Sequence, residues 1–198
     1  SAYVSYTDIF QPQDNRDRNG NYLDPVQGKN YEVGVKGEYL DGRLNTSLAL
    51  FKVKQSKVAV LDGDELVPGS FEQAYTTADG VTTKGVELEV SGQLAPGWNA
   101  TFGASRYVAK DANDADINTN LPQTALKLFT SYTPQSLQAL TVGGGANWQN
   151  RIYYAVPAYG RIEQNGYALV SAFVRYRISP EFSVCLLYTS DAADDSLR

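Results

Sequence analysis

The sequence has no histidine and no methionine, and it has a single cysteine, Cys185. Without histidine, neither a Ser-His-Asp nor a Cys-His catalytic arrangement can be built from these 198 residues. One cysteine allows no internal disulfide, and no Cys or His cluster has the spacing of a metal site. We therefore expect a protein that is not an enzyme, with no catalytic residues and no metal of its own.

A long apolar run and an excess of positive charge are also missing. No stretch approaches the ~20 apolar residues that a membrane-spanning helix needs. The net charge is −5, which argues against a nucleic-acid partner because phosphates would require a basic face. The first residues have neither the basic region nor the apolar core of a signal peptide, so we expect any targeting signal upstream. A single soluble domain and a β-barrel both remain compatible with this composition.

What is present is a period-two alternation of apolar and polar residues, which is typical of β-strands. In residues 29–40, for example, Val33 and Val35 alternate with Glu32 and Lys36. About nine such segments follow one another along the chain, at residues 3–10, 29–40, 43–53, 85–94, 98–108, 124–133, 140–149, 165–178 and 182–188.

The connections between these segments alternate strictly between short and long. The short turns lie at residues 41–43, 95–98, 134–139 and 179–181, and the long polar loops at residues 11–28, 59–80, 110–121 and 152–164. A meander that crosses a bilayer has short periplasmic turns at one rim and long extracellular loops at the other. A soluble sandwich has connections of mixed length. The pattern therefore predicts an all-β fold, an antiparallel transmembrane β-barrel segment of about nine strands.

Aromatic residues agree with this orientation. If the short turns are periplasmic, five aromatic residues fall at the periplasmic strand ends, namely Tyr39, Trp98, Tyr132, Tyr176 and Phe182. Tyr31 and Trp148 fall nearer the outer rim. Such positions form the aromatic girdles of membrane barrels. The alternative is that aromatic residues near strand ends cover the edge of a soluble core.

Several segments also resemble a known family. They are residues 3–13, the tripeptide Leu23-Asp24-Pro25, and residues 28–38, 42–45, 49–51 and 85–92. Together they resemble the TonB-dependent ferric-siderophore receptors, in particular the pyoverdine and hydroxamate receptors. The resemblance is strong over residues 2–98 and looser up to residue 184.

The resemblance implies a 22-stranded outer-membrane barrel plugged by an N-terminal globular domain. Residues 1–184 would then be a C-terminal part of the barrel, with the plug domain outside this chain. The implied function is active uptake of a ferric siderophore across the bacterial outer membrane, energised by the TonB complex through an N-terminal region that is also outside this chain. The implied surroundings are outer-membrane lipid and lipopolysaccharide. Iron would be carried by the siderophore, so no cofactor of the protein is expected.

Residues 185–198 depart from the family. A complete barrel of this type ends on a strand with a terminal aromatic residue, whereas this chain ends Asp194-Asp195-Ser196-Leu197-Arg198. We expect residues 185–198 to be a non-native tail that resembles translated adapter sequence. Cys185 therefore supports no redox inference.

The candidate ligand-binding residues lie in the segment 151–161. The oxygen atoms of the siderophore supply the ligands of the iron, so a receptor recognises the outside of the chelate. Such recognition favours aromatic and Arg side chains on a concave wall. The candidates at the predicted extracellular rim are Tyr153, Tyr154, Tyr159 and Arg161. The alternative is an upper aromatic girdle with loop packing. Acidic loop residues are expected to be solvated, or bridged to lipopolysaccharide by divalent ions, namely Asp62, Asp64, Glu65, Asp111, Asp114 and Asp116.

Three other functions remain open at this point. A passive porin would share the strand and loop pattern but needs no plug. An outer-membrane hydrolase or protease is disfavoured by the lack of histidine in these residues. A soluble β-structured binding module would remain in buffer without detergent.

Overall fold

The computed structural model describes residues 1–156 and 160–191, which form thirteen β-strands. Nine of these strands make one antiparallel sheet in the order β1-β2-β3-β6-β7-β8-β9-β12-β13. Their bounds are β1 (Ala2–Gln11), β2 (Val26–Tyr39), β3 (Leu44–Ser56), β6 (Val81–Ala95), β7 (Trp98–Lys110), β8 (Thr124–Tyr132), β9 (Leu140–Gln149), β12 (Tyr167–Arg177) and β13 (Ser183–Asp191). The sheet confirms the predicted all-β fold and the predicted number of strands. Within the described ranges, no helix is long and apolar enough to cross a membrane.

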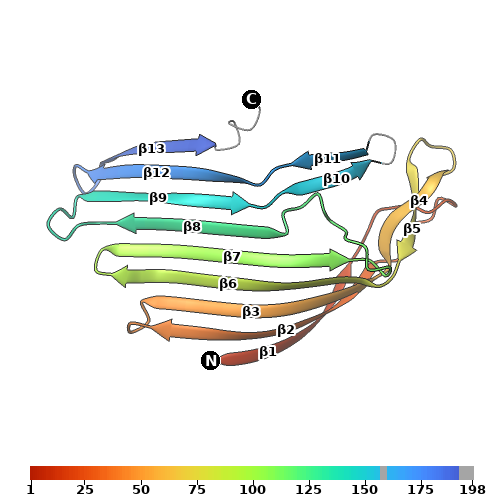
Figure 1. The fold of residues 1–198 in the computed structure, drawn as a ribbon, viewed down its shortest axis with the longest axis horizontal. Coiled ribbons are helices and arrows are strands. Elements are labelled where there is room, and N and C mark those ends of the chain that lie inside the picture. The colour runs from red at the N-terminus through yellow and green to blue at the C-terminus, as the bar shows by residue number, and fades with distance from the viewer. Residues whose placement is uncertain (157–159, 192–198) are drawn as a thin grey trace.

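The sheet is a meander in which every pairing is antiparallel. Figure 1 shows the short turns at one end of the sheet and the long connections at the other. The β2–β3 turn is tight because Leu40, Asp41 and Gly42 all have positive φ angles, of 55°, 56° and 82°. The predicted alternation of short and long connections is therefore present in the structure.

Two of the segments predicted to be loops contain hairpins, so that part of the prediction was incomplete. Strands β4 (Val58–Leu66) and β5 (Gln73–Ala78) pair within the connection between β3 and β6. Strands β10 (Ile152–Val156) and β11 (Gly160–Gln164) pair within the connection between β9 and β12. The first hairpin is stabilised by its own small core, in which Val67 is 2% exposed and Ala74 is 0% exposed.

The register of the sheet assigns each side chain to one of two faces, because directly opposite residues share a face. Val33, Leu50 and Val86 are successive partners across β2, β3 and β6. Their neighbours Glu32 and Phe51 are paired on the opposite face. Val33 is 50% exposed and Leu50 is 54% exposed, although both are apolar. One face of the sheet is therefore apolar and uncovered by the chain itself, and we call it the outward face.

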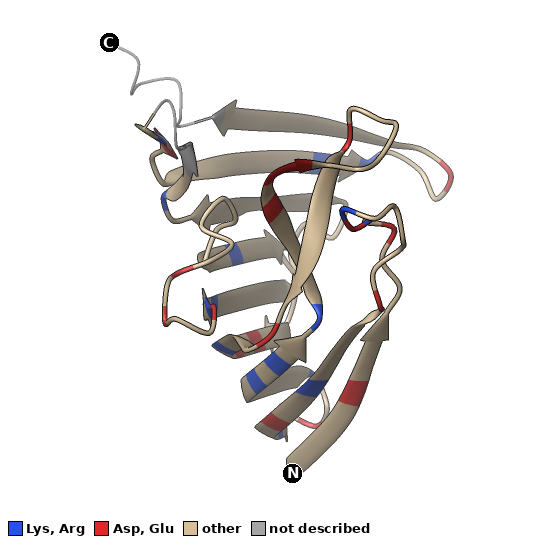
Figure 2. Cartoon of the chain, turned by 90° about the vertical axis from the view of Figure 1, so that its right-hand side faces the viewer, with Lys and Arg blue, Asp and Glu red and all other residues tan. Residues whose placement is uncertain are grey.

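The other face carries most of the acidic strand residues and surrounds a hollow, and we call it the lumenal face. The sheet curves, as the end-on view in Figure 2 shows. A barrel that crosses lipid has this distribution, with apolar residues outside and polar residues inside.

The aromatic residues predicted for the periplasmic rim lie at the end of the sheet that carries the short turns. They lie at or within one residue of a strand end and are half exposed, namely Tyr39 (54%), Trp98 (45%), Tyr132 (44%), Tyr176 (46%) and Phe182 (58%). Trp98 is the direct partner of Tyr132, and its indole N–H donates to Thr130 Oγ1 at 2.8 Å. Rings that are exposed and retain a hydrogen-bonding edge suit a membrane interface better than the edge of a soluble core.

The end of the described chain is strand β13, which pairs with β12 from Arg177↔Ser183 to Leu169↔Asp191. This strand includes the first part of the segment that we expect to be a non-native tail. Residues 192–198 lie outside the described residues, so the expectation about the tail stays a prediction.

Candidate functional site

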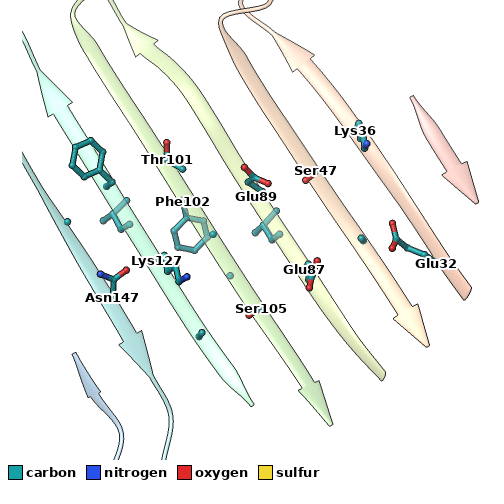
Figure 3. Close-up of a pocket in the computed structure, with 18 of the residues that line it drawn as sticks. Glu32, Lys36, Ser47, Glu87, Glu89, Thr101, Phe102, Ser105, Lys127 and Asn147 are labelled. Atoms are coloured by element: carbon teal, nitrogen blue, oxygen red, sulfur yellow. The ribbon is translucent and has the colours of Figure 1, made fainter. Parts of the chain in front are cut away.

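The lumenal face surrounds a hollow of about 740 Å³ that spans β1 to β9 and reaches β12. Figure 3 shows its polar side chains on neighbouring strands, with Glu32 and Lys36 on β2 and Glu87 and Glu89 on β6. Lys127 on β8 lies on the far side of the acidic pair. The wall therefore presents both signs of charge, which suits contact with a polar surface or passage of a polar molecule.

Tyr3 organises the β1 end of this wall. Its hydroxyl donates a hydrogen bond to Glu32 Oε1 at 2.5 Å, and the Lys36 Nζ lies 5.1 Å from its ring centre. The ring fits closely because the residue opposite is Gly34, where a Cβ atom would lie 2.6 Å from it. A cation, a ring and a carboxylate are thus held together on one patch of the lumenal wall.

A second patch is aromatic. The rings of Phe129 and Phe173 stack with centroids 5.9 Å apart and planes inclined by 4°. They come from β8 and β12, on either side of β9, and glycines of β9 leave the space between them. A Cβ atom on Gly143 would lie 2.5 Å from the Phe173 ring, so the stack requires glycine there.

The β10–β11 hairpin brings together two of the predicted ligand-binding residues. The Arg161 guanidinium carbon lies 3.5 Å from the centre of the Tyr153 ring. Glu163, the direct partner of Tyr153, forms an ion pair with Arg161 Nε at 2.5 Å and accepts a hydrogen bond from an Arg151 terminal nitrogen at 3.2 Å. The Tyr153 backbone N–H also donates to Thr119 O in the β7–β8 connection at 2.8 Å. This face of the hairpin therefore combines an aromatic ring with two guanidinium groups around one carboxylate.

The other two predicted residues are placed differently. Tyr154 pairs with Ile162, so it lies on the opposite face of the hairpin, and it is 58% exposed. Tyr159 lies outside the described residues, and its role stays a prediction. Glu163 was missed at the sequence level. The Arg161-Ile162-Glu163 alternation is the signal that could have placed it beside Arg161 on a strand.

Three ion pairs join the β1–β2 connection to the connection that carries β4 and β5. Arg18 donates to both carboxylate oxygens of Asp62, each at 2.7 Å. The other two pairs are Arg16–Glu72 at 2.5 Å and Lys57–Asp24 at 2.7 Å. The two long connections therefore form one unit at this end of the sheet, which we call the loop clasp.

We expected the acidic loop residues to be solvated, but several of them have partners within the protein. The Asp62 side chain is only 17% exposed, and its hydrogen bonds from the Arg18 guanidinium hold the pKa of the Asp62 carboxyl below its usual value. Asp114 is paired with Lys110 at 2.9 Å. Asp111 accepts the backbone N–H groups of Asn113 and Ala115 and so closes its own turn. Within residues 1–156 and 160–191, no three acidic or Cys side chains gather in a way that could hold a metal ion.

Comparisons with known proteins agree with this arrangement. The family model described as TonB dependent receptor-like, beta-barrel matches residues 1–188. The ferric-pyoverdine BN7/BN8 receptor of Pseudomonas putida is 41% identical over 186 residues, which are 92% of this chain and 22% of that protein. The pyoverdine outer-membrane receptor FpvA of Pseudomonas aeruginosa superposes with a TM-score of 0.83 at 40% identity, covering 94% of this chain and 28% of that chain.

A third relative is the alcaligin outer-membrane receptor FauA of Bordetella pertussis. It has a TM-score of 0.73 at 41% identity and covers 96% of this chain and 32% of that chain. This chain thus spans about a quarter of the length of the relatives it matches. The curved meander, its two faces and these matches lead to one assignment: the chain belongs to the TonB-dependent receptor β-barrel family and is part of a bacterial outer-membrane barrel.

Proposed function

We propose that this chain is part of the barrel of an outer-membrane receptor that takes up a ferric siderophore with energy supplied through TonB. The observation that carries the proposal is the 41% identity to a ferric-pyoverdine receptor, which extends over 92% of the chain. The match covers only 22% of that receptor. The proposal therefore places residues 1–184 in a longer protein with a plug domain, a TonB-binding segment and a barrel of 22 strands.

The lumenal wall supports the presence of an enclosed domain. Glu32, Lys36, Glu87, Glu89 and Lys127 face the hollow with both signs of charge. A globular plug with polar residues could pair with such a wall, whereas an apolar wall would not hold it. The outward face supports the membrane setting, since so many exposed apolar side chains would aggregate in water. That face disfavours the soluble binding module.

The proposed ligand is a ferric peptide siderophore of the pyoverdine class. The chelate supplies the oxygen ligands of the iron, so the receptor needs only to recognise its outer surface. The Tyr153–Arg161 face of the β10–β11 hairpin offers a ring and a cation for that purpose. We propose Tyr153 and Arg161 as ligand contacts, with Glu163 holding Arg161 in place. The protein then acts by binding and transport and not by catalysis.

A binding titration tests this function. The full-length receptor in detergent is titrated with ferric pyoverdine, with iron-free pyoverdine and with ferric citrate, and tryptophan fluorescence is recorded. We expect saturable binding of ferric pyoverdine and much weaker binding of ferric citrate. Failure to bind ferric pyoverdine or any other ferric siderophore, by a receptor that is folded, would contradict the proposal.

A further inference from the structure

The charged side chains of the lumenal face are divided by sign between the two halves of the sheet. Their positions follow from the register, because direct partners share a face. On β2 and β6 they are mostly acidic, namely Glu32, Glu38, Glu87, Glu89 and the single cation Lys36. On β7, β8, β9 and β12, which the structure describes in full, they are all cations, namely Lys127, Arg175 and Arg177. A body that fills this lumen therefore meets a basic wall on the β8–β12 side.

Two of these cations line a small hollow at the end of the sheet that carries the short turns. Arg175 and Arg177 are two residues apart on β12, so they point to the same face. The hollow has a volume of about 200 Å³, and its other walls are Thr141, Ser183 and residues of the β8–β9 and β12–β13 connections. Every residue that lines it precedes position 184, so the hollow does not involve the expected tail.

Neighbouring residues hold Arg175 in place. It is the direct partner of Thr141 on β9, and its guanidinium donates a hydrogen bond to Thr141 Oγ1 at 3.4 Å. Thr141 is 7% exposed, and its hydroxyl is hydrogen-bonded to the Thr133 hydroxyl at 2.9 Å. Because an arginine carries five N–H donors, this contact positions the guanidinium and leaves other donors for a partner.

The charge of the hollow is not balanced by the described chain. Among the ion pairs of residues 1–156 and 160–191, none involves Arg175 or Arg177, and both arginines are exposed. Of the described residues that line the hollow, Glu181 alone is acidic, and its carboxylate accepts the Ser179 hydroxyl at 3.0 Å within its own turn. Removing two such cations from bulk water is costly unless an anion pairs with them. A filled lumen therefore has to bring a negative charge to this position.

The size of the hollow decides between two anionic occupants. Pockets for small-molecule ligands typically measure about 300–1,000 Å³, whereas this hollow measures about 200 Å³. It is too small for a ferric peptide siderophore but has room for the end of one acidic side chain. A guanidinium group also recognises a carboxylate through two parallel N–H···O bonds. The geometry favours an aspartate or glutamate that is carried by a protein surface.

We propose that Arg175 and Arg177 dock an acidic side chain of the globular domain that the barrel encloses. The inference rests on the proposed function, because it requires the plug domain of the longer protein. Charge complementarity selects this partner, since a plug that fits a wall divided by sign must present acidic residues to β12. The β10–β11 hairpin, with Tyr153 and Arg161, lies at the other end of the sheet (Figure 1). The contact therefore fastens the plug without touching the proposed siderophore contacts.

A zero-length cross-link tests the contact directly. In the full-length receptor, Arg175→Lys with Arg177→Lys keeps both positive charges and supplies two amines, which a carbodiimide joins to an adjacent carboxylate as an amide. Mass spectrometry of the digested protein identifies the joined peptides. We expect the new amines to be joined to an Asp or Glu of the N-terminal domain. Lys84, on the outward face of β6, is the internal control and should give no link to that domain.

A second pair of variants measures what the contact does. Arg175→Gln with Arg177→Gln removes both cations from the hollow, and the matched control, Lys84→Gln with Arg106→Gln, removes two cations from the outward face. We expect hydrogen exchange of the plug peptides found in the cross-link to accelerate at least about tenfold in the first variant, because an enclosed carboxylate loses its charged partner. Exchange in the control should match that of the unchanged receptor. Resistance to heat-induced loss of electrophoretic mobility reports folding, and ferric-pyoverdine binding should be equal in all variants.

Cross-links confined to Glu181 and other barrel carboxylates, or no cross-link at all, would overturn the proposal. Equal exchange of the plug in the Arg175/Arg177 variant and in the control would also overturn it. If the receptor binds ferric pyoverdine and gives either of these results, only the docking contact is wrong. If it gives the cross-link but binds no ferric siderophore, the docking contact is supported and the proposed function is contradicted.

Discussion

The Arg161 guanidinium lies over the Tyr153 ring at 3.5 Å and is fixed there by the Glu163 carboxylate. A planar cation stacked on a ring presents one broad, rigid surface, and rigid aromatic and Arg anchors account for most of the energy in many interfaces. Tyr154 belongs to the other face of the same hairpin. Tyr153 and Tyr154 therefore allow the two faces of one hairpin to be compared in their effect on ligand binding.

Replacing Tyr153 with Ala should weaken the binding of ferric pyoverdine by more than ~1 kcal/mol, because it removes both the ring and the support for Arg161. Replacing Tyr154 with Ala removes the same ring from the opposite face and should change the affinity less than about twofold. Titration of both variants in detergent provides the measurement. Equal losses in the two variants would show that the hairpin does not present a single binding face.

The hydrogen-bonding role of Glu163 is tested by Glu163→Gln. The change retains the shape but removes the charge that holds Arg161 and Arg151. We expect weaker siderophore binding, with a larger change in dissociation rate than in association rate, because the Arg161 surface is no longer held in place. Stopped-flow measurements separate the two rates. An unchanged dissociation rate would count against this role.

The loop clasp should loosen in acid. Because its hydrogen bonds with Arg18 lower the pKa of Asp62 in the folded state, the pair stabilises the clasp above the usual Asp value of 3.8 and ceases to do so as the pH falls through the lowered value. Hydrogen exchange of residues 57–80 should therefore accelerate on acidification in this range. The Arg18→Gln variant should exchange fast at all pH values, and a pH profile identical to that of the unchanged receptor would contradict the assignment.

The aromatic stack in the lumen should depend on Gly143. A side chain there would collide with the Phe173 ring and with the Thr130 carbonyl oxygen, both at 2.5 Å from the Cβ position. We expect Gly143→Ala to lower the free energy of unfolding by ~1–3 kcal/mol, the usual cost of overpacking. Gly103→Ala is the control, since a Cβ atom there meets nothing within 4 Å. Denaturant unfolding of the two variants in detergent should differ by that amount, and equal stabilities would contradict the packing argument.

The two faces of the sheet should respond differently to a new charge. Leu88→Arg places a cation among Leu48 and Ala104 on the outward face and should cost up to ~2–4 kcal/mol at mid-bilayer. Ser105→Arg places the same charge next to Glu87 on the lumenal face, where it has a carboxylate partner. The fraction of receptor that folds into lipid vesicles should fall only for the first variant. A similar yield for both would reverse the assignment of faces.

The strands and their faces could be predicted from the sequence because their signal is local. A two-residue period in β2 separates Val33 and Val35 from Glu32 and Lys36 regardless of what the rest of the chain does. The connections are set by contacts between distant residues. The Arg16–Glu72 pair joins positions 56 residues apart, and no periodicity in the sequence predicts it. The β4–β5 and β10–β11 hairpins were missed for a different reason, because each lies inside a long connection that also contains polar residues typical of open loops.

The candidate site was predictable in its chemistry but not in its geometry. The residue types of the 151–161 segment indicated a ring and a cation, and the hairpin brings Tyr153 and Arg161 together. Tyr153 and Tyr154 point to opposite faces because they are consecutive residues of one strand, and this was not predicted because residues 152–164 were expected to form a loop. The lysines that pair across β2, β3 and β6 were missed because they are far apart in the sequence and meet only through strand pairing.

Uptake of radioactive iron tests the central claim most directly. A strain that lacks every other siderophore receptor is supplied with ferric pyoverdine labelled with iron-55, with and without the gene that encodes this receptor and with and without a functional TonB. The account predicts that iron enters only when both the receptor and TonB are present, and that Tyr153→Ala lowers the uptake at limiting ligand. Equal uptake in cells with and without the receptor, for pyoverdines and other ferric siderophores alike, would contradict it.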